Sequence, residues 1–319
     1  MLTQRTSQRP PSELVIGLVN NMPAAARRAT ERQFAALLKT ASRRLGIGVR
    51  LFAVETLLDD PDDTLDVLRH AGADALIVTG AEPRSSAITD EPLWPALGRL
   101  IDWAADRTIS TIWSCMAAHA AVYRLDKISR RRLPHKLSGV FTCLKAGNHE
   151  LLADAPGCWP VPHSRHNTLD EMELLGSGYT VLSHAPCIGA DCFVKQTRAS
   201  LFLLLQGHPE YGPDSLLNEF RRDVRRFVLG QRERWPDIPA GYFDAEVVAE
   251  LVRLGKRAGA APGADVLASV DAAITVAPRQ VWRPAAVGLY VTWLSYLSEQ
   301  KAACDDAAFR PMRNWRIAS

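Results

Sequence analysis

Hydrophobic and polar positions along residues 13–126 follow two alternating periods. Short apolar runs typical of buried strands occupy residues 13–19, 48–54, 73–80 and 108–113. Segments with helical spacing separate these runs, at residues 29–45, 64–72 and 93–106. Strands and helices that alternate in this way predict an α/β fold, with a mostly parallel sheet flanked by helices on both faces. Ligands of such sheets bind at the carboxyl ends of the strands.

The pattern changes in the second half of the chain. Four shorter strand-like runs, which predict the remaining strands and an antiparallel section, lie at residues 137–144, 178–185, 191–197 and 201–207. A strong helix at 216–230, a proline-containing link, a second helix at 244–259 and a flexible break at 260–265 follow. We therefore expect a flexible tail over 1–12, a catalytic α/β domain over 13–230, and a helical extension over 231–319 that packs on it.

Composition narrows the class of protein. The chain has 319 residues, of which 47% are hydrophobic and 23% charged, so it can bury a substantial core. No apolar run approaches the roughly 20 residues of a membrane span, and no apolar signal-peptide core follows the basic N-terminus. We expect a soluble, cytoplasmic protein without a membrane partner.

Charge is mild, with a net value of +3 and scattered arginines, so the sequence predicts no nucleic-acid partner. The basic segment "ISRRRLPHK" at 128–136 is interpreted either as a solvated loop or as a site for an anionic phosphate.

Six cysteines contain no C-x-x-C pair, and a cytoplasmic protein is not expected to carry a disulfide framework. Most are expected to be small buried residues. A zinc site can be drawn from His184, Cys187 and Cys192, but its spacing fits no common ligand pattern, so we predict no metal.

Cys115 stands apart because "TIWSCMAAHA" (111–120) places it between a predicted strand and an alanine-rich helix. A nucleophile at such a turn lies above the sheet, near the positive end of the helix dipole and beside free backbone N–H groups. Small residues at Ala117 and Ala118 allow a close approach of the helix. The elbow glycines are absent, however, and a core cysteine remains the alternative.

The segment "LFLLLQGHPEYGP" (201–213) supplies a partner for this cysteine, because its apolar strand ends in Gly207 and then presents His208 and Glu210. Residues two apart in extended backbone project to one side, so Glu210 can accept from one ring nitrogen while the other faces a thiol. A turn with a surface ion pair is the alternative. With Cys115 on the same sheet, we favour a catalytic triad.

These features together resemble one family: the homoserine O-acyltransferases of the succinyltransferase type, which share the glutamine amidotransferase-like fold. The resembling stretches run in family order over roughly residues 15–298 and include "DALIVTGAEP", "STIWSCMAAHAAV", "KLSGV", "PHSRH", "QGHPEY", "NEFRRDV" and "TWLSYL". The resemblance implies an acyl-accepting Cys115, a proton-accepting His208 and Glu210 as third catalytic residue.

The resemblance also implies substrate-binding roles for Lys136, Ser164, Glu219 and Arg222. Three positions apart on a helix, Glu219 and Arg222 share a face, where a carboxylate and a guanidinium suit the ammonium and carboxylate of an amino acid. An ordinary salt bridge between them is the alternative.

The implied reaction is ping-pong acyl transfer from succinyl-CoA or acetyl-CoA to the hydroxyl of L-homoserine, in methionine biosynthesis, with no bound cofactor. Backbone N–H groups of Met116, Gly80 and Ala81 are the candidate oxyanion donors. The partners expected are these small molecules and a second copy of the chain in a homodimer.

The sequence departs from the family in a shorter N-terminal arm, a shorter segment between the second and third strands, and a longer region at 244–282. The position linked to acyl-donor choice falls on Arg84, where glycine or glutamate is typical. An arginine there suits the distal carboxylate of a succinyl group, so succinyl-CoA is the expected donor.

Three alternatives remain open at this point: a glutaminase of the same fold, an O-acyltransferase for serine or another amino-alcohol, and a binding protein with a vestigial triad. Ammonia release from glutamine, or CoA release with other acceptors, would distinguish them.

Overall fold

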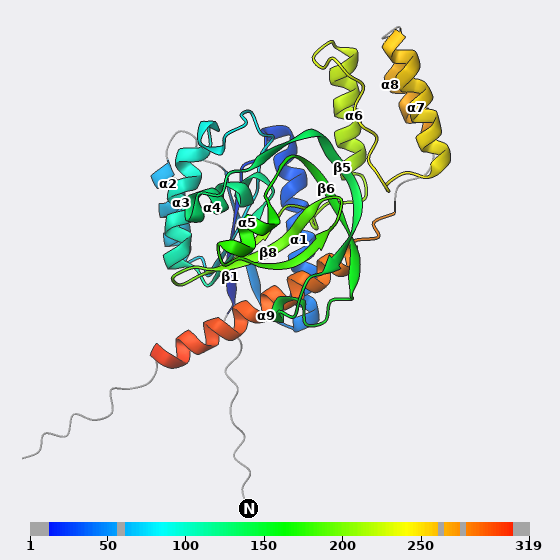
Figure 1. Cartoon of the computed structure of the whole chain (residues 1–319). Coiled ribbons are helices and arrows are strands. Elements are labelled where there is room, and N and C mark those ends of the chain that lie inside the picture. The colour runs from blue at the N-terminus through cyan, green and yellow to red at the C-terminus, as the bar shows by residue number, and fades with distance from the viewer. Residues whose placement is uncertain (1–12, 56–60, 261–264, 275–278, 309–319) are drawn as a thin grey trace, which may run out of the picture.

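A computed structural model describes residues 13–55, 61–260, 265–274 and 279–308, so the expected tail over 1–12 lies outside the described residues. Within these ranges, nine strands form one sheet in the order β2-β1-β3-β4-β9-β8-β7-β5-β6 (Figure 1). The strands are β1 (Leu14–Asn20), β2 (Val49–Glu55), β3 (Ala75–Val78), β4 (Ser110–Ser114), β5 (Arg131–Lys145), β6 (Cys158–Thr168), β7 (Thr180–Ala185), β8 (Gly189–Gln196) and β9 (Leu201–Leu205).

The helices are α1 (Ala24–Leu45), α2 (Pro61–His70), α3 (Trp94–Arg107), α4 (Met116–Asp126), α5 (Glu171–Gly176), α6 (Ser215–Val228), α7 (Ala245–Ala260), α8 (Asp265–Ala273) and α9 (Arg283–Ala308). Two short 3-10 turns, η1 (Ile88–Asp90) and η2 (Glu150–Leu152), complete the described elements.

The parallel half of the sheet comprises β2, β1, β3, β4 and β9; β3, β4 and β9 are buried at every position, and β3 and β9 are apolar throughout. Alternate side chains of these strands serve opposite faces. Ile77, Ile112 and Leu203 pack against α1 and α9, whereas Val78 and Trp113 pack against α2, α3 and α4. Burial on both faces explains why these strands are continuous apolar runs, and it confirms the predicted α/β fold class.

The antiparallel half comprises β8, β7, β5 and β6. Strands β5 and β6 form a long hairpin that curves around this side of the molecule (Figure 1). Strand β6 was not predicted, because Pro160 and Pro162 interrupt the strand pattern. Proline is tolerated here because β6 is the edge strand of the sheet.

The basic segment 128–136 is only partly a loop, because β5 already begins at Arg131. Arg131 pairs with Thr168 of β6 and forms ion pairs with Asp170 and Glu173. The interpretation as a solvated loop is therefore wrong for residues 131–136: pairing with β6 extends the strand further back than the apolar pattern indicated.

The C-terminal helices divide between two cores. Helices α7 and α8 pack on α6 through an apolar cluster that includes Phe220, Leu251 and Val270, and they project from the sheet with it (Figure 1). Helix α9 returns to the sheet and packs beside α1 through Tyr290 and Trp293. None of the described helices combines the length and apolar character that a membrane span requires.

Candidate active site

Cys115 occupies the sharp turn between β4 and α4. Its backbone has φ 53° and ψ −113°, a conformation that residues with a side chain rarely adopt. The Cys115 amide donates to the Leu205 carbonyl of β9 at 2.7 Å, and its carbonyl accepts from the His119 amide at 3.2 Å. These bonds hold the strained turn without the elbow glycines, and the cysteine side chain stays partly accessible.

Gly80 follows β3, the strand beside β4, and approaches the turn closely. A Cβ added at Gly80 would lie 2.8 Å from the Met116 nitrogen and 3.0 Å from the Ser114 oxygen. Only glycine therefore leaves the amide that follows Cys115 uncovered on this side. Gly80, Ala81 and Met116 all line the same cavity as Cys115.

His208 comes from the loop after β9, on the other side of β4. Its Nδ1 lies 2.8 Å from Glu210 Oε1, and the backbone amide of His208 donates to Pro162 of β6 at 2.8 Å. Burial opposes a charged imidazole, but the charge of Glu210 and hydrogen bonds to Cys115 and Glu210 raise the His208 pKa well above its usual value. The partly accessible thiol of Cys115 thus meets the buried imidazole of His208 and the buried carboxylate of Glu210, an arrangement that suits a nucleophile, a base and an orienting carboxylate.

Tyr211 supports this histidine from one side. The two rings stack with centroids 4.3 Å apart and an angle of 16° between their planes. The Tyr211 hydroxyl donates to Glu219, which links the triad to the next group of polar residues. The sequence analysis missed this role, although "QGHPEY" places an aromatic ring directly after the triad carboxylate.

Lys136, Ser164 and Glu219 converge from β5, β6 and α6 on the far side of the cavity. The Lys136 ammonium lies 3.0 Å from both Glu219 and Asp223, and the Ser164 hydroxyl donates to Glu219. Burial favours the neutral acids, yet Lys136 and these hydrogen bonds lower the pKa of Glu219, and Lys136 with Arg222 lowers that of Asp223. Both carboxylates are therefore ionised at neutral pH.

Arg222 lines the cavity but pairs with Asp223, through Nε at 3.1 Å and Nη2 at 3.0 Å. Glu219 therefore pairs with Lys136, and Arg222 pairs with Asp223, which also contacts Lys136. The sequence pattern did not single out Asp223. Asp223 lies four positions after Glu219 on one helix, and this spacing was the available signal.

Arg84 is exposed and is not among the residues that line this cavity. Its backbone amide instead donates to both carboxylate oxygens of Glu91 at 3.0 Å. Neighbouring residues of the same loop, Ala81, Glu82 and Pro83, do line the cavity.

The buried side-chain amide of Gln206 contacts two residues that line the cavity, His119 and Arg165. Its Oε1 lies 3.0 Å from His119 Nε2 and accepts from Arg165 Nη1 at 3.0 Å. Burial lowers the pKa of His119 to about 3, so its imidazole is neutral. Both His119 and Arg165 line the cavity, and neither role was visible in the sequence, because the partners are far apart along the chain.

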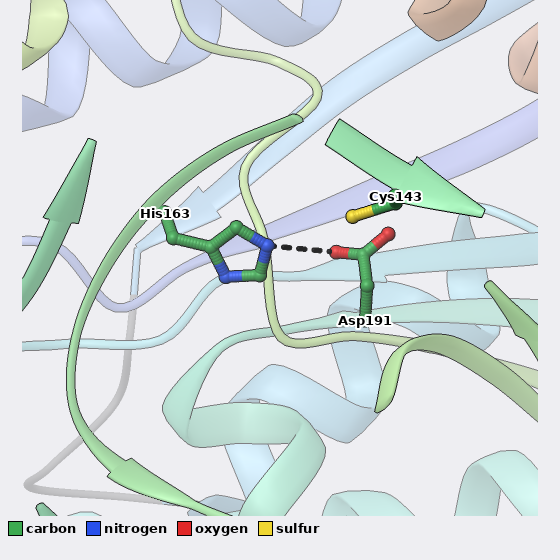
Figure 2. A group of neighbouring side chains, drawn as sticks. All are labelled: Cys143, His163 and Asp191. Atoms are coloured by element: carbon green, nitrogen blue, oxygen red, sulfur yellow. Dashed lines mark ion pairs between the residues drawn. The ribbon is translucent and has the colours of Figure 1, made fainter. Parts of the chain in front are cut away.

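Among the described residues, one group could hold a metal ion: Cys143, His163 and Asp191, whose ligand atoms lie within 4.8 Å of one another (Figure 2). Asp191 accepts from Ser183 at 2.7 Å and lies 3.2 Å from His163. Burial raises the pKa of Asp191, but His163, Ser183 and the charge of Arg165 together lower it below its usual value. Asp191 is therefore an ionised carboxylate in a buried polar network with Ser183, His163 and Arg165.

The zinc ligands drawn from the sequence do not form such a group. His184 contacts Glu171 at 3.1 Å, Cys187 is exposed, and Cys192 is buried in the core. The six cysteines are free.

Comparisons with known proteins identify the family of this chain. A family model described as "HTS: Homoserine O-succinyltransferase" matches residues 1–304. A homoserine O-succinyltransferase of Methylorubrum extorquens is 42% identical over 299 residues, which is 91% of this chain and 88% of the relative. One of Rhodopseudomonas palustris is 44% identical over 295 residues, covering 89% and 88%.

A glutamine amidotransferase structure from Methylobacillus flagellatus matches with a TM-score of 0.52 and 13% identity, over 90% of this chain and 96% of that one. At this identity the likeness concerns the fold alone, and it agrees with the predicted glutamine amidotransferase-like architecture.

Proposed function

The chain belongs to the homoserine O-succinyltransferase family, and from this premise we propose that it transfers a succinyl group from succinyl-CoA to the hydroxyl of L-homoserine through an acyl-cysteine. The observation that carries the proposal is the triad: a strained, accessible Cys115 shares a cavity with His208, whose Nδ1 is held by Glu210. With Nδ1 engaged, Nε2 is the ring nitrogen that serves the thiol.

In the first half-reaction, the Cys115 thiolate attacks the thioester carbonyl of the acyl donor. The Met116 amide, left uncovered by Gly80, and the Ala81 amide stabilise the oxyanion. The carbon–sulfur bond to CoA breaks, the CoA sulfur takes a proton from the imidazolium of His208, and the succinyl group remains on Cys115.

In the second half-reaction, neutral His208 accepts the proton of the homoserine hydroxyl as its oxygen attacks the acyl-cysteine. The thiolate leaves, and O-succinylhomoserine is released. Both half-reactions need only groups of the chain itself and the two substrates.

The polar end of the cavity suits an amino acid. Glu219 is an ionised carboxylate for the homoserine ammonium, and it is oriented by Lys136, Ser164 and Tyr211. Asp223 occupies Nε and Nη2 of Arg222, which leaves the Nη1 donors for the homoserine carboxylate.

We propose succinyl-CoA as the donor because the matched relatives are named for succinyl transfer. Arg84 remains the proposed determinant of this choice, through attraction to the distal carboxylate. Turnover of Arg84→Glu with succinyl-CoA and acetyl-CoA tests the point: we expect a falling succinyl-to-acetyl ratio, and an unchanged ratio would refute the role of Arg84.

The decisive experiment is intact-mass spectrometry of the protein after mixing with succinyl-CoA alone. We expect a mass increase of one succinyl group, its absence in Cys115→Ala, and its loss when homoserine is added. Cys187→Ala, at an exposed cysteine away from the cavity, is the matched control and should acylate normally.

Two results would overturn the proposal. One is the absence of an adduct together with ammonia release from glutamine, which indicates a glutaminase. The other is an adduct that serine discharges faster than homoserine, which retains the chemistry and changes the acceptor. We also propose that the enzyme is a cytoplasmic homodimer, as the family resemblance implies, and sedimentation velocity tests the dimer.

A further inference from the structure

The loop between β3 and η1 lines the cavity and is attached to the rest of the molecule by a buried ion pair. Glu91, directly after η1, lies 2.5 Å from Arg130, which precedes β5. Their side chains are only 3% and 1% exposed, which makes this pair unlike the solvent-exposed salt bridges of the surface. Arg130 belongs to the basic segment 128–136, of which the proposed reaction uses only Lys136.

Both members of the pair bind the backbone of the loop. Glu91 accepts from the amides of Arg84 at 3.0 Å and Ser85 at 3.1 Å. Arg130 donates to the carbonyls of Ser85 at 2.6 Å and Ser86 at 3.0 Å. The loop therefore provides the hydrogen bonds that make burial of the two charges tolerable, and the charges in turn fix the loop.

The ion pair of Glu91 and Arg130 supports the side of the cavity that lies beside Cys115. The residues held by the ion pair follow immediately after Ala81, Glu82 and Pro83, which line the cavity beside Cys115. The other side of the cavity is held mainly by contacts among its own residues, since Lys136 pairs with Glu219 and the Ser164 hydroxyl donates to Glu219. Glu82 of the loop also pairs with Arg226 of α6 at 2.7 Å, so displacement of the loop should disturb the side beside Cys115 more strongly than the side formed by Lys136 and Glu219.

We propose that Glu91 and Arg130 are positioning residues for the acyl donor: the pair holds the loop at 81–85 so that the acyl group lies between this loop and Cys115. The proposal rests on the proposed function and deepens it. A guanidinium is required because one planar group must reach Glu91 and successive carbonyls together, which an ammonium does not do.

The test uses Arg130→Lys, which keeps the charge, and Glu91→Gln, which keeps the shape. The matched control is Arg124→Lys, because Arg124 also makes a two-pronged contact with a carboxylate, Asp102, but on the exposed surface between α3 and α4. Each protein is assayed for acyl-enzyme formation from succinyl-CoA, for KM toward homoserine, and for hydrogen exchange in a peptide covering 82–87.

For both variants we expect kcat/KM toward succinyl-CoA to fall by about 10²-fold through misplacement of the reacting groups. We expect KM for homoserine to change much less, because Lys136, Ser164 and Glu219 are also bound to one another. Exchange at the amides of Arg84 and Ser85 should accelerate, whereas Arg124→Lys should match the wild type in every measurement.

Two results would overturn the inference: unchanged donor kinetics in Arg130→Lys with wild-type exchange, or an equal loss toward donor and acceptor. If one variant does not fold, the other and the exchange data still decide. Failure of the wild type itself to form an acyl-enzyme would instead refute the proposed function, while the exchange measurement would still report whether the ion pair holds the loop.

Discussion

Replacing Gly80 with alanine tests the oxyanion site directly. The added methyl group would lie 2.8 Å from the Met116 nitrogen. An oxyanion that accepts a hydrogen bond from the Met116 amide must lie about 2.7–3.1 Å from the Met116 nitrogen. The methyl group of alanine would lie at a similar distance from that nitrogen and would compete with the substrate oxygen for the space. The neighbouring contact, 3.0 Å to the Ser114 oxygen, is with backbone and leaves little room for relief.

Loss of one oxyanion donor typically reduces the rate by about 10²–10³-fold, or roughly 2.7–4 kcal/mol of transition-state stabilisation. We therefore expect Gly80→Ala to form the acyl-enzyme about 10²-fold or more slowly. Stopped-flow detection of CoA release from succinyl-CoA, without homoserine, measures this step.

Gly98→Ala is the matched control, because Gly98 is buried in α3 and a Cβ there meets nothing within 4 Å. Alanine is preferred over glycine within a helix by about 1 kcal/mol, so this variant should keep its rate and lose no stability. A burst rate in Gly80→Ala within about twofold of wild type would refute the assignment of the Met116 amide, since an oxyanion donor is worth far more. A thermal melt of both proteins separates local blocking from unfolding.

Three further predictions concern the catalytic loop and the polar end of the cavity. The His208 pKa is raised in the folded protein, so protonated His208 stabilises the fold. This contribution is complete below about pH 6.5, the pKa of a free imidazole, and it is lost as pH rises through the folded-state pKa of His208. Glu210→Gln removes the negative charge that raises the His208 pKa, so thermal melts across pH should show the stabilisation by His208 disappearing at a lower pH than in the wild type. An unshifted pH profile would contradict this prediction. Gly207→Ala places a Cβ 2.6 Å from the Asp191 carboxylate and should cost about 1–3 kcal/mol in urea unfolding, together with activity. Gly212→Ala, whose nearest contact is 3.7 Å, should be neutral, and equal behaviour of the two would refute the argument. Lys136→Met leaves two carboxylates facing each other and should lower unfolding free energy by about 3–5 kcal/mol; a change below about 1 kcal/mol would show that the pair is not buried in solution.

Local pattern was sufficient for the elements around the nucleophile. The runs at 73–80, 108–113 and 201–207 correspond to β3, β4 and β9, because strands buried on both faces are rich in apolar and β-branched residues. The turn at Cys115 and the pair His208 and Glu210 were also identified, since each depends on residues that are neighbours along the chain.

Edge elements were harder to predict. The prolines of β6 disguise a strand that pairs only on one side, and the charged start of β5 depends on that pairing. The ion pair of Glu91 and Arg130 was likewise invisible, because a glutamate and an arginine read as surface residues until both are found buried.

The sequence by itself determined the fold class and indicated Cys115, His208 and Glu210 as the residues proposed for the triad, because hydrophobic period and short-range spacing act within one element and its immediate turn. Only the tertiary structure decided that β4 lies between β3 and β9, so that Gly80, Cys115 and His208 meet at one edge. It also decided that Lys136 from β5 reaches Glu219 and Asp223 on α6, and that Glu91 holds the backbone amide of Arg84. These outcomes depend on sheet order and on which charges become buried, and both are set by contacts between segments distant in the chain rather than by any local pattern.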